Sequence, residues 1–532
     1  MMVSSLLSND RGVAIVAVTM VMVVSALLGA AIITQTSQDI QLTDRTYTDK
    51  QALYFAESAK ERGYREIMNN NNFTTIGNDG VLANVSLPGG SYDLTATTLS
   101  MSPKVVRMVA TGRTDTVDRQ VTVVSEVIEE NVCVWNNAVF GGSGQTGGVI
   151  KGNTAIHGSV HLLGEGVGSG NNSIEALDLI GNSLVHNNYQ GMPAALLAKV
   201  PAMPTTVFGG ETVDTLYAKL RVKNGAVGVS GNSEIGEANI IGNAFKETMD
   251  GIYIETDPTA IRFTGNQVVD GVPNPDRVFS DNGTEALYDL GNLVQFPRLD
   301  EPYTDSVTGI SYATYEAYYL SMALSLPPIT LDDSNAAALA IQGHAFPPGV
   351  TVVINGDAFS VTDGTNSIQY DPSSLAGGQA HLDISGMIHC NGNLVIGEKN
   401  LDISYTGRGT IYAGEVGSSG GDVDIHSNLM PTGIFPTSDV LGLMAKQYMN
   451  LATGPGDSQL MMAGAFYAGV QVTSPKQSEM AGTFVCDYFD MGTNVPHLYQ
   501  VPALVDNLPP GLIGSDPIWV VTGFEERSWQ LD

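Results

Sequence analysis

The sequence predicts a mainly β protein that begins with one long α-helix, continues into a small antiparallel sheet and ends in a large β-solenoid of the right-handed β-helix type. Three observations predict this. Residues 13–33 form an uncharged apolar stretch, glycine supplies 60 of 532 residues while only 15% are charged, and Gly-Asn pairs recur between short apolar runs. Low charge with many Gly, Asn and β-branched residues is typical of strands joined by tight turns.

The apolar stretch at residues 13–33 is interrupted only by Thr19, Ser25 and Gly29. As a helix it spans about 31 Å, which is enough to cross the hydrocarbon core of a bilayer. We therefore expect a retained membrane helix that includes Val13, Ala17, Gly29 and Ile33. The alternative is a cleaved secretory signal peptide, but the stretch is longer than the usual signal-peptide core and no clear cleavage site ends it.

The chain after this stretch predicts a continuing helix. Residues 34–68 contain no proline and one glycine, Gly63, and they include the favourable i,i+4 pair Glu61 and Arg65. We expect one transmembrane and then amphipathic helix over residues 13–72, ended by the asparagines at 69–72. Residues 73–130 follow as a small antiparallel β-unit, because residues 91–97, 104–110 and 117–128 are rich in alternating or β-branched residues.

Residues 131–430 carry the Gly/Asn-rich pattern that predicts the β-solenoid, with Gly and Asn at corners of positive φ and apolar residues stacked inward. Insertions are expected near residues 192–223 and 296–328, and residues 431–532 are expected to continue the stack and to cap it. Short helices are predicted at residues 213–220, 312–326 and 439–448. The alternative for this whole region is a set of β-sandwich domains with Gly-rich turns.

Two segments near the N-terminus resemble the corresponding region of PilX-type minor pilins. The first is Arg11-Gly12-Val13 with the apolar run that follows it, and the second is the stretch from Ala52 through Ala56 and Glu57 to Ala59. The resemblance covers roughly residues 8–65. Phe55 and Ser58 stand where the family pattern has alanine, and Ala17 stands at the fifth mature position, where most major pilins have glutamate.

The resemblance implies a leader peptide at residues 1–12, cut by prepilin peptidase between Gly12 and Val13. It implies a pilin-like helix and sheet and insertion into a type IV pilus or related filament. Ala17 argues against a major, repeating subunit, and the bulk of the domain after residue 130 favours low copy number. The implied location is the inner membrane, single-pass with a periplasmic C-terminal domain, and after assembly the pilus or cell surface. Implied partners are the inner membrane, the peptidase and other pilin or minor pilin subunits, with a tip adhesin, a surface or a polysaccharide as further candidates. A plain membrane anchor that needs no cleavage is the alternative.

The charge is strongly negative and unevenly placed. The net charge is −31, and residues 131–532 hold 41 acidic against 14 basic side chains. Such a surface repels phosphate backbones, so we expect no nucleic-acid partner.

The three cysteines, Cys133, Cys390 and Cys486, form no disulfide framework. They are either one bridge with a spare thiol or three buried free thiols.

The sequence offers no convincing catalytic, cofactor or metal site. His157 and His161 are four residues apart, and we expect them on one side of a strand, while His389 and His426 are isolated. No phosphate-binding, hydrolase or calcium-loop motif occurs. Tyrosines at 303, 312, 315, 318 and 319 gather in one insertion, where packing is favoured over a binding ridge.

We therefore expect a non-catalytic protein for pilus assembly, adhesion or partner binding. The alternative is a membrane-anchored periplasmic β-helix protein that binds or cleaves polysaccharide and joins no filament.

Overall fold

A computed structural model describes the chain at residues 10–70, 80–144, 150–152, 154–167, 175–254, 261–263, 268–269, 272–273, 277–284, 286–375, 379–418, 420–491 and 496–532. The chain divides into two compact units. Unit one comprises Met1–Glu130 together with Trp519–Asp532, and unit two comprises Asn131–Ile518. The fold is mainly β with one long N-terminal helix, as the sequence predicts.

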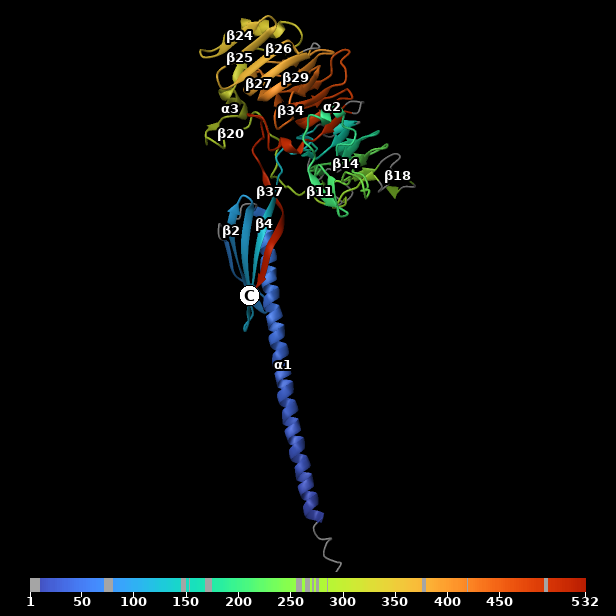
Figure 1. Ribbon diagram of the computed structural model, residues 1–532, viewed down its shortest axis with the longest axis vertical. Helices are drawn as coiled ribbons and strands as arrows, with labels where there is room; N and C mark the ends of the chain where they lie inside the picture. Colours follow the sequence, from blue (N-terminus) through green and yellow to red (C-terminus); the bar gives the residue numbers. More distant parts are fainter. Residues whose placement is uncertain are drawn as a thin grey trace, which may run out of the picture. The chain divides into compact units, whose positions relative to one another are not determined.

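Unit one contains the helix α1 (Asp10–Asn70) and a five-stranded sheet with the order β1-β2-β3-β4-β37. Figure 1 shows α1 as one continuous coil with the sheet beside its C-terminal half. The strands β1 (Gly80–Leu87), β2 (Gly90–Met101), β3 (Lys104–Arg113) and β4 (Asp118–Asn131) pair antiparallel in sequence order. The antiparallel β-unit predicted at residues 73–130 is therefore present in the described residues from 80 onward.

One face of this sheet is covered by α1. Alternate residues of the strands are buried, as the period of two requires, and Leu94, Met108 and Val123 form a common core with Ala59 and Ile67 of α1. Burial of such side chains contributes about 25 cal/mol per Å² of apolar surface. This core therefore fixes the second half of the helix to the sheet.

The C-terminus differs from the sequence prediction. Residues 431–532 were expected to continue and cap the stack, but β37 (Trp519–Leu531) lies next to β4 in the sheet of unit one. Backbone hydrogen bonds join Gln120 and Asp532 in both directions, at 3.1 and 2.9 Å. The strand β37 pairs with the edge strand β4, whose backbone N–H and C=O groups on that side would otherwise have no strand to bond with. Unit two is thus inserted between two neighbouring strands of unit one.

Unit two is built on three ladders of parallel strands, and its long strands β27, β29, β34 and β35 each take part in more than one ladder. The first ladder runs through β22 (Leu324–Leu326), β27 (Gln379–Cys390), β29 (Asp402–Ala413), β32 (Val440–Ala445), β34 (Met461–Thr473), β35 (Glu479–Asp490), β5 (Val139–Gly141), β8 (Val160–Leu162), β13 (Lys219–Val222) and β16 (Gly251–Ile254). In register, Ile388, Ile411, Leu443, Phe466 and Phe484 stack on one another and are at most 1% exposed. The apolar residues of the short runs therefore do face inward.

The other two ladders repeat this arrangement. The second contains β23 (Ile329–Leu331), β28 (Leu394–Ile396), β30 (Val423–Ile425), β33 (Tyr448–Leu451), the last residues of β34 and β35, β6 (Ile150–Gly152), β9 (Glu175–Leu179), β14 (Ala226–Val229) and β17 (Ile261–Phe263). The third contains β27, β29, β31 (Asn428–Pro431), β34, β35, β36 (His497–Tyr499), β7 (Ala155–His157), β10 (Leu184–His186) and β15 (Glu234–Ile235).

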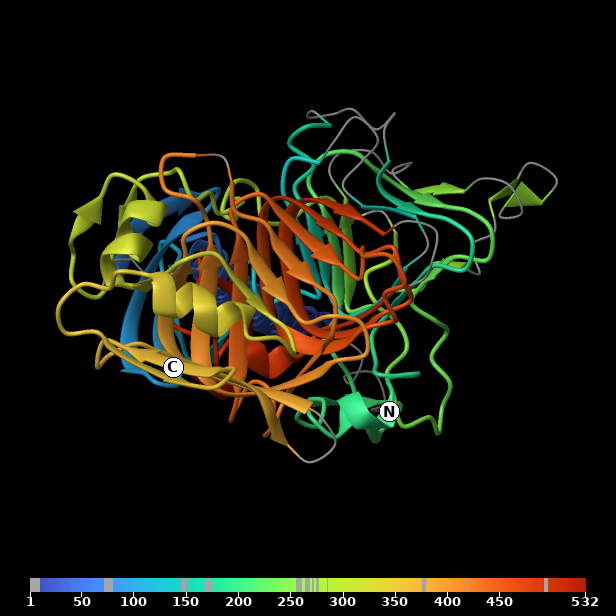
Figure 2. The ribbon, with the colours of Figure 1, turned by 90° about the horizontal axis from the view of Figure 1, so that it is seen from above.

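The order of strands in the ladders does not follow the sequence. β35, near the end of unit two, pairs with β5 and β6, which lie near its start. Figure 2 shows the red strands directly beside the teal ones. The chain therefore enters the ladders in their middle, at β5, and proceeds from there to one end, at β17. It resumes at the opposite end with β22 and β23, and from there it runs back until β35 pairs with β5 and β6.

Antiparallel pairing in the described part of unit two is limited. It joins β24 (Thr351–Asn355), β25 (Ala358–Thr362) and β26 (Ser367–Leu375) to β27, and it forms the hairpins β11 (Thr205–Phe208) with β12 (Glu211–Asp214), β18 (Val268–Val269) with β19 (Val272–Pro273), and β20 (Tyr303–Thr304) with β21 (Ser311–Tyr312). β-Sandwich domains need antiparallel neighbours throughout. The sandwich alternative therefore does not describe these ladders.

The predicted short helices were mostly wrong. Residues 213–220 belong to β12, a connection and β13, and residues 439–448 contain β32, whose six residues are all buried. A fully buried apolar run cannot be assigned to helix or strand by periodicity alone. In the third case, α3 (Tyr315–Met322) is shorter than predicted and is capped by Thr314, whose Oγ1 accepts from the Ala317 N–H. The other helices among the residues that the structure describes are α2 (Ala194–Leu197), α4 (Ala336–Gly343) and a 3₁₀ turn at Pro502–Leu504.

Candidate functional sites

The first half of α1 presents apolar side chains that nothing in the described structure covers. The helix Ala14–Asn69 is long and apolar enough to cross a membrane, and none of its most apolar window is buried. Ile15, Met20, Leu27 and Ile33 are each at least 65% exposed. Exposed apolar surface on this scale marks a membrane or protein contact.

Small residues interrupt this exposed surface at the positions named from the sequence. Ala17 is exposed, and a Cβ added at Gly29 would meet nothing within 4 Å. Small residues allow two helix backbones to approach closely in a membrane. Gly12 lies within α1, while the side chain of Val13 and residues 1–9 of the expected leader lie outside the described residues.

The second half of α1 uses small residues for a different contact. Ala52, Ala56 and Ala59 are completely buried, and with Gly63 they line one helix face at spacings of four, three and four residues. A Cβ on Gly63 would stand 2.7 Å from Leu94 Cδ2. The alanine-rich segment of α1 therefore forms the contact between the helix and the sheet.

Polar contacts lie beside this helix–sheet contact within unit one. Arg119 Nε donates to Asp49 Oδ1 at 2.6 Å, and the Tyr64 hydroxyl lies 2.7 Å from Ser125 Oγ and donates to Glu526 Oε1 at 3.0 Å. Burial raises the pKa of Tyr64 to about 12. Glu57, the third residue named from the sequence, pairs with Lys60 at 2.9 Å, and Lys60 Nζ also lies 3.4 Å from Glu526 Oε1 of β37.

The histidines that the sequence singled out have ordinary structural partners. His157 lies in β7 and His161 in β8, which belong to different ladders, so the expectation that they share one side of a strand was wrong. His157 Nδ1 lies 2.9 Å from the Asn188 carbonyl, and burial, with the charge of His186, lowers the pKa of His157 to about 3. His161 Nε2 lies 2.8 Å from the Tyr288 hydroxyl.

His389 and His426 are likewise bound within the fold. His389 Nε2 lies 2.8 Å from the Gly414 carbonyl, and His426 Nδ1 lies 2.7 Å from Asp457 Oδ2. Both contacts join neighbouring segments of the ladders. The tyrosines of the 296–328 insertion also pack mainly on one another, with the Tyr303 and Tyr315 rings 4.8 Å apart.

All three cysteines are buried free thiols, which decides between the two alternatives left open by the sequence. Burial raises the pKa of Cys133 to about 11 and that of Cys390 to about 12. Thiols with raised pKa values are poor nucleophiles and poor metal ligands. The cysteines therefore act as small core residues.

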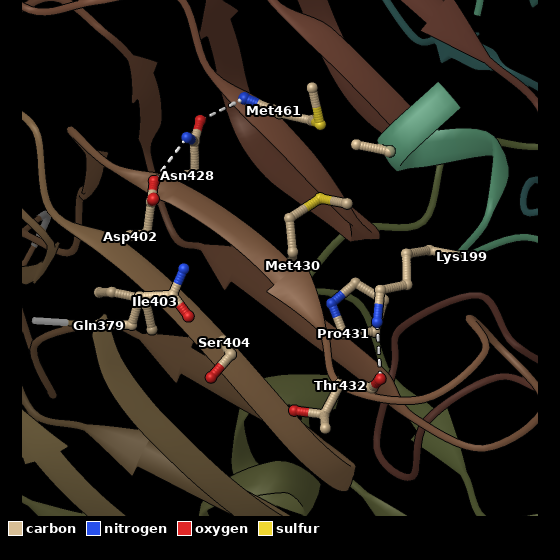
Figure 3. A pocket seen from close by; sticks show the side chains of 11 residues that line it. Lys199, Gln379, Asp402, Ile403, Ser404, Asn428, Met430, Pro431, Thr432 and Met461 are labelled. Atoms are coloured by element: carbon tan, nitrogen blue, oxygen red, sulfur yellow. Dashed lines mark hydrogen bonds between the residues drawn. The ribbon is translucent and has the colours of Figure 1, made fainter. Parts of the chain in front are cut away.

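A cavity of about 410 Å³ lies on the outer side of the third ladder, against α2 (Figure 3). Its lining is mixed: Ile403, Met430, Pro431 and Met461 are apolar, and they alternate with polar residues, which are Lys199, Gln379, Asp402, Ser404, Asn428 and Thr432. The polar groups beside them are mostly engaged: Asn428 Nδ2 donates to Asp402 Oδ1 at 2.7 Å, and Lys199 Nζ donates to the Thr432 carbonyl at 2.7 Å.

One cluster was not found from the sequence. His186, Glu234 and Glu237 bring three potential ligand atoms within 4.8 Å of one another. They come from β10 and from β15 with its following turn, about fifty residues apart in the chain. No local motif marks these positions, since only the register of β10 on β15 brings them together.

The fold is similar to that of a solved pilin. The crystal structure of the competence-associated pilin ComZ from Thermus thermophilus aligns with 91% of this chain and 98% of its own, with a TM-score of 0.53 and 20% sequence identity. At this identity the likeness describes the fold alone, which is pilin-like. No family model matches the chain, and no curated protein sequence matches it.

Proposed function

We propose that this chain is a non-catalytic, minor pilin-like component of a type IV pilus or related filament. It is anchored in the inner membrane before assembly and displays unit two for assembly, adhesion or partner binding. The observation that carries this proposal is the division of α1. Its first half exposes a continuous apolar surface, and its second half is seated on an antiparallel sheet through Ala52, Ala56 and Ala59.

A helix of this kind suits both a bilayer and a filament core. In lipid, the backbone N–H and C=O groups are hydrogen-bonded within the helix, and the apolar side chains contact the lipid tails. In a filament, the same surface packs against the helices of other pilin subunits, and small residues such as Ala17 and Gly29 allow close approach. The membrane and other pilin or minor pilin subunits are therefore the partners that this surface fits.

The assignment to the PilX type and the processing step belong to the same proposal. Arg11-Gly12-Val13 resembles a prepilin-peptidase site, with the cut between Gly12 and Val13. Ala17 in place of glutamate, together with the bulk of residues 131–518, favours a subunit of low copy number. ComZ is described as a competence-associated pilin. A competence-associated filament is therefore one of the filaments in which to look for this chain.

We further infer that the three ladders are the sides of one β-solenoid. In-register stacking of Ile388, Ile411 and Leu443 along the first ladder supports this, because successive coils of a solenoid place like residues above one another. With 41 acidic against 14 basic side chains over residues 131–532, this domain is strongly acidic. We expect it to face the periplasm and, after assembly, the cell surface.

The first test is the mature N-terminus of the native protein, determined by mass spectrometry in cells with and without prepilin peptidase. We expect a peptide that begins at Val13, that disappears without the peptidase, and that is found in sheared filament fractions. A Gly12→Leu variant should remain uncut, whereas the matched variant Gly29→Ala should be processed normally.

Other outcomes would contradict the proposal in different ways. An intact leader in both strains leaves a plain membrane anchor and the alternative of a periplasmic polysaccharide-binding or polysaccharide-cleaving protein. A cut after residue 33 means a secreted protein. Binding of polysaccharide by the full chain in detergent, without any presence in filaments, would favour the alternative function.

A further inference from the structure

The three side chains His186, Glu234 and Glu237 are placed by neighbouring strands of the third ladder. β10 pairs with β7 on one side and with β15 on the other, with Val185 opposite Ile235 and Leu184 opposite Glu234. Val185 and Ile235 point into the core and are completely buried. By the alternation of a strand, His186 and Glu234 point to the outer face of the ladder.

Gly236 brings the second carboxylate back to the same face. It has φ +64°, its N–H donates to the Val185 carbonyl at 2.7 Å, and a Cβ there would stand 2.4 Å from the Phe279 carbonyl oxygen. Glycine is therefore required at this corner. Immediately beyond it, the Glu237 N–H donates to the Glu247 carbonyl at 3.0 Å, which fixes the backbone of the third ligand.

The imidazole is buried, and its outer nitrogen lacks a hydrogen bond. His186 is 5% exposed, and its Nε2 has no hydrogen-bond partner in the part of the chain that the structure describes. Nε2 lies 3.5 Å from Glu234 Oε1 and 3.9 Å from Glu237 Oε1. A charge-assisted hydrogen bond would instead bring these atoms to about 2.7–2.9 Å. The nitrogen is thus aimed between two carboxylates without bonding to either.

The separations suit an ion in the middle. A tetrahedral zinc ion with bonds of about 2.0–2.1 Å places its ligand atoms about 3.3 Å apart. The distances of 3.5 and 3.9 Å from Nε2 are close to this value, and all three atoms lie within 4.8 Å of one another.

We propose that His186, Glu234 and Glu237 form a binding site for a divalent transition-metal ion, with Zn²⁺ as the best fit. One imidazole and two carboxylates suit ions of borderline softness, whereas Ca²⁺ and Mg²⁺ take oxygen ligands. The side chains of Glu234 and Glu237 are 19% and 36% exposed, so the ion is reached from solvent on that side. A fourth position stays open for water or for a ligand atom of a partner.

Neighbouring groups orient the ligands and favour a cation. The other oxygen of Glu234, Oε2, lies 3.3 Å from Arg277 Nη1, and the His157 ring packs edge-to-face on His186 at 5.6 Å. A cation between the Glu234 and Glu237 carboxylates would offset the repulsion between their charges. It would also join β10, β15 and the following turn on the outer face.

The test is zinc binding by the purified full chain in detergent. We expect one Zn²⁺ per chain by equilibrium dialysis with elemental mass spectrometry, and d–d absorption bands of a four-coordinate site when Co²⁺ is the probe. His186→Asn should abolish binding, and Glu237→Gln should weaken it by at least tenfold. Glu237→Gln is the safer variant for folding, because Glu237 is partly exposed and lies at a turn.

The matched control is His381→Asn, because His381 lies elsewhere in unit two and contacts the Ser404 and Thr406 hydroxyls. This variant should bind one Zn²⁺ as the parent chain does. Absence of saturable zinc binding, or equal binding by the parent and Glu237→Gln chains, would overturn the proposal. Binding of Ca²⁺ in preference to Zn²⁺ would overturn the assigned metal class. None of these results depends on filament formation.

Discussion

Gly112 of β3 lies directly against Ala52 of α1: a Cβ on Gly112 would stand 2.0 Å from the Ala52 carbonyl oxygen and 2.5 Å from the Ala56 nitrogen. The helix backbone therefore touches the sheet backbone at this point. Such an approach requires a residue without a side chain on the sheet and small residues on the helix. It explains why the alanine-rich segment of α1 and one glycine of β3 belong together.

Gly112→Ala is expected to destabilise unit one, because the new methyl group meets helix backbone that cannot move aside. Overpacking of this kind costs about 1–3 kcal/mol. The measurement is the midpoint of chemical unfolding for the full chain in detergent, followed by circular dichroism. Gly523→Ala in β37 is the control, since its Cβ would meet only Ile128 Cδ1 at 3.8 Å. Equal midpoints for the two variants would disprove the close approach.

Ala56→Leu tests the helix side of the same contact. Ala56 is completely buried, so a larger side chain should force the helix away from the sheet at a cost of about 1–3 kcal/mol. Tyr54→Ala, on the exposed side of the same turn, should change the unfolding free energy by less than about 0.5 kcal/mol. The same unfolding experiment decides this, and a tolerated Ala56→Leu would mean that the helix is seated elsewhere.

Val23→Lys is expected to weaken membrane anchoring. Val23 lies at the middle of the apolar stretch and is 52% exposed. A lysine at the centre of a membrane helix costs about 2.5–3.5 kcal/mol on insertion scales. The readout is the fraction of the unprocessed chain that resists carbonate extraction from membranes. Gln41→Lys, beyond the apolar stretch, should be extracted no more than the parent, and full retention of Val23→Lys would argue against a spanning helix.

The buried imidazole of His161 is expected to lower the stability of the folded chain at acidic pH. Burial, together with Arg221 and Lys223, holds the pKa of His161 well below its usual value of about 6.5. Below pH of about 6.5 the unfolded chain therefore binds a proton that the folded chain does not, and stability falls as pH falls. For this group the slope is at most about 1.4 kcal/mol per pH unit.

The measurement compares unfolding free energies at pH 7.5 and 5.0. His161→Gln keeps a polar partner for the Tyr288 hydroxyl but does not titrate, so its stability should depend less on pH than that of the parent. His381→Gln controls for the loss of a histidine elsewhere in unit two. An unchanged pH dependence in His161→Gln would show that the buried imidazole contributes nothing to the acid sensitivity.

The sequence by itself determined the features that depend on neighbouring residues. The uncharged stretch from Val13 to Ile33, the missing helix breakers up to Gly63, and the alternation in residues 91–128 predicted α1 and the antiparallel sheet. Short apolar runs between glycines and asparagines predicted a mainly β unit two. These signals are periodic and local, so one chain is sufficient to read them.

Only the tertiary structure decided which distant strands pair. β37 returns to β4 across the whole of unit two, and β35 meets β5, although the partners are more than 300 residues apart. The buried run of β32 gave no period to distinguish strand from helix. His186 meets Glu234 and Glu237 through the register of β10 on β15 and the turn at Gly236. Pairing of this kind is fixed by burial and hydrogen bonding between segments, and local sequence carries no record of it.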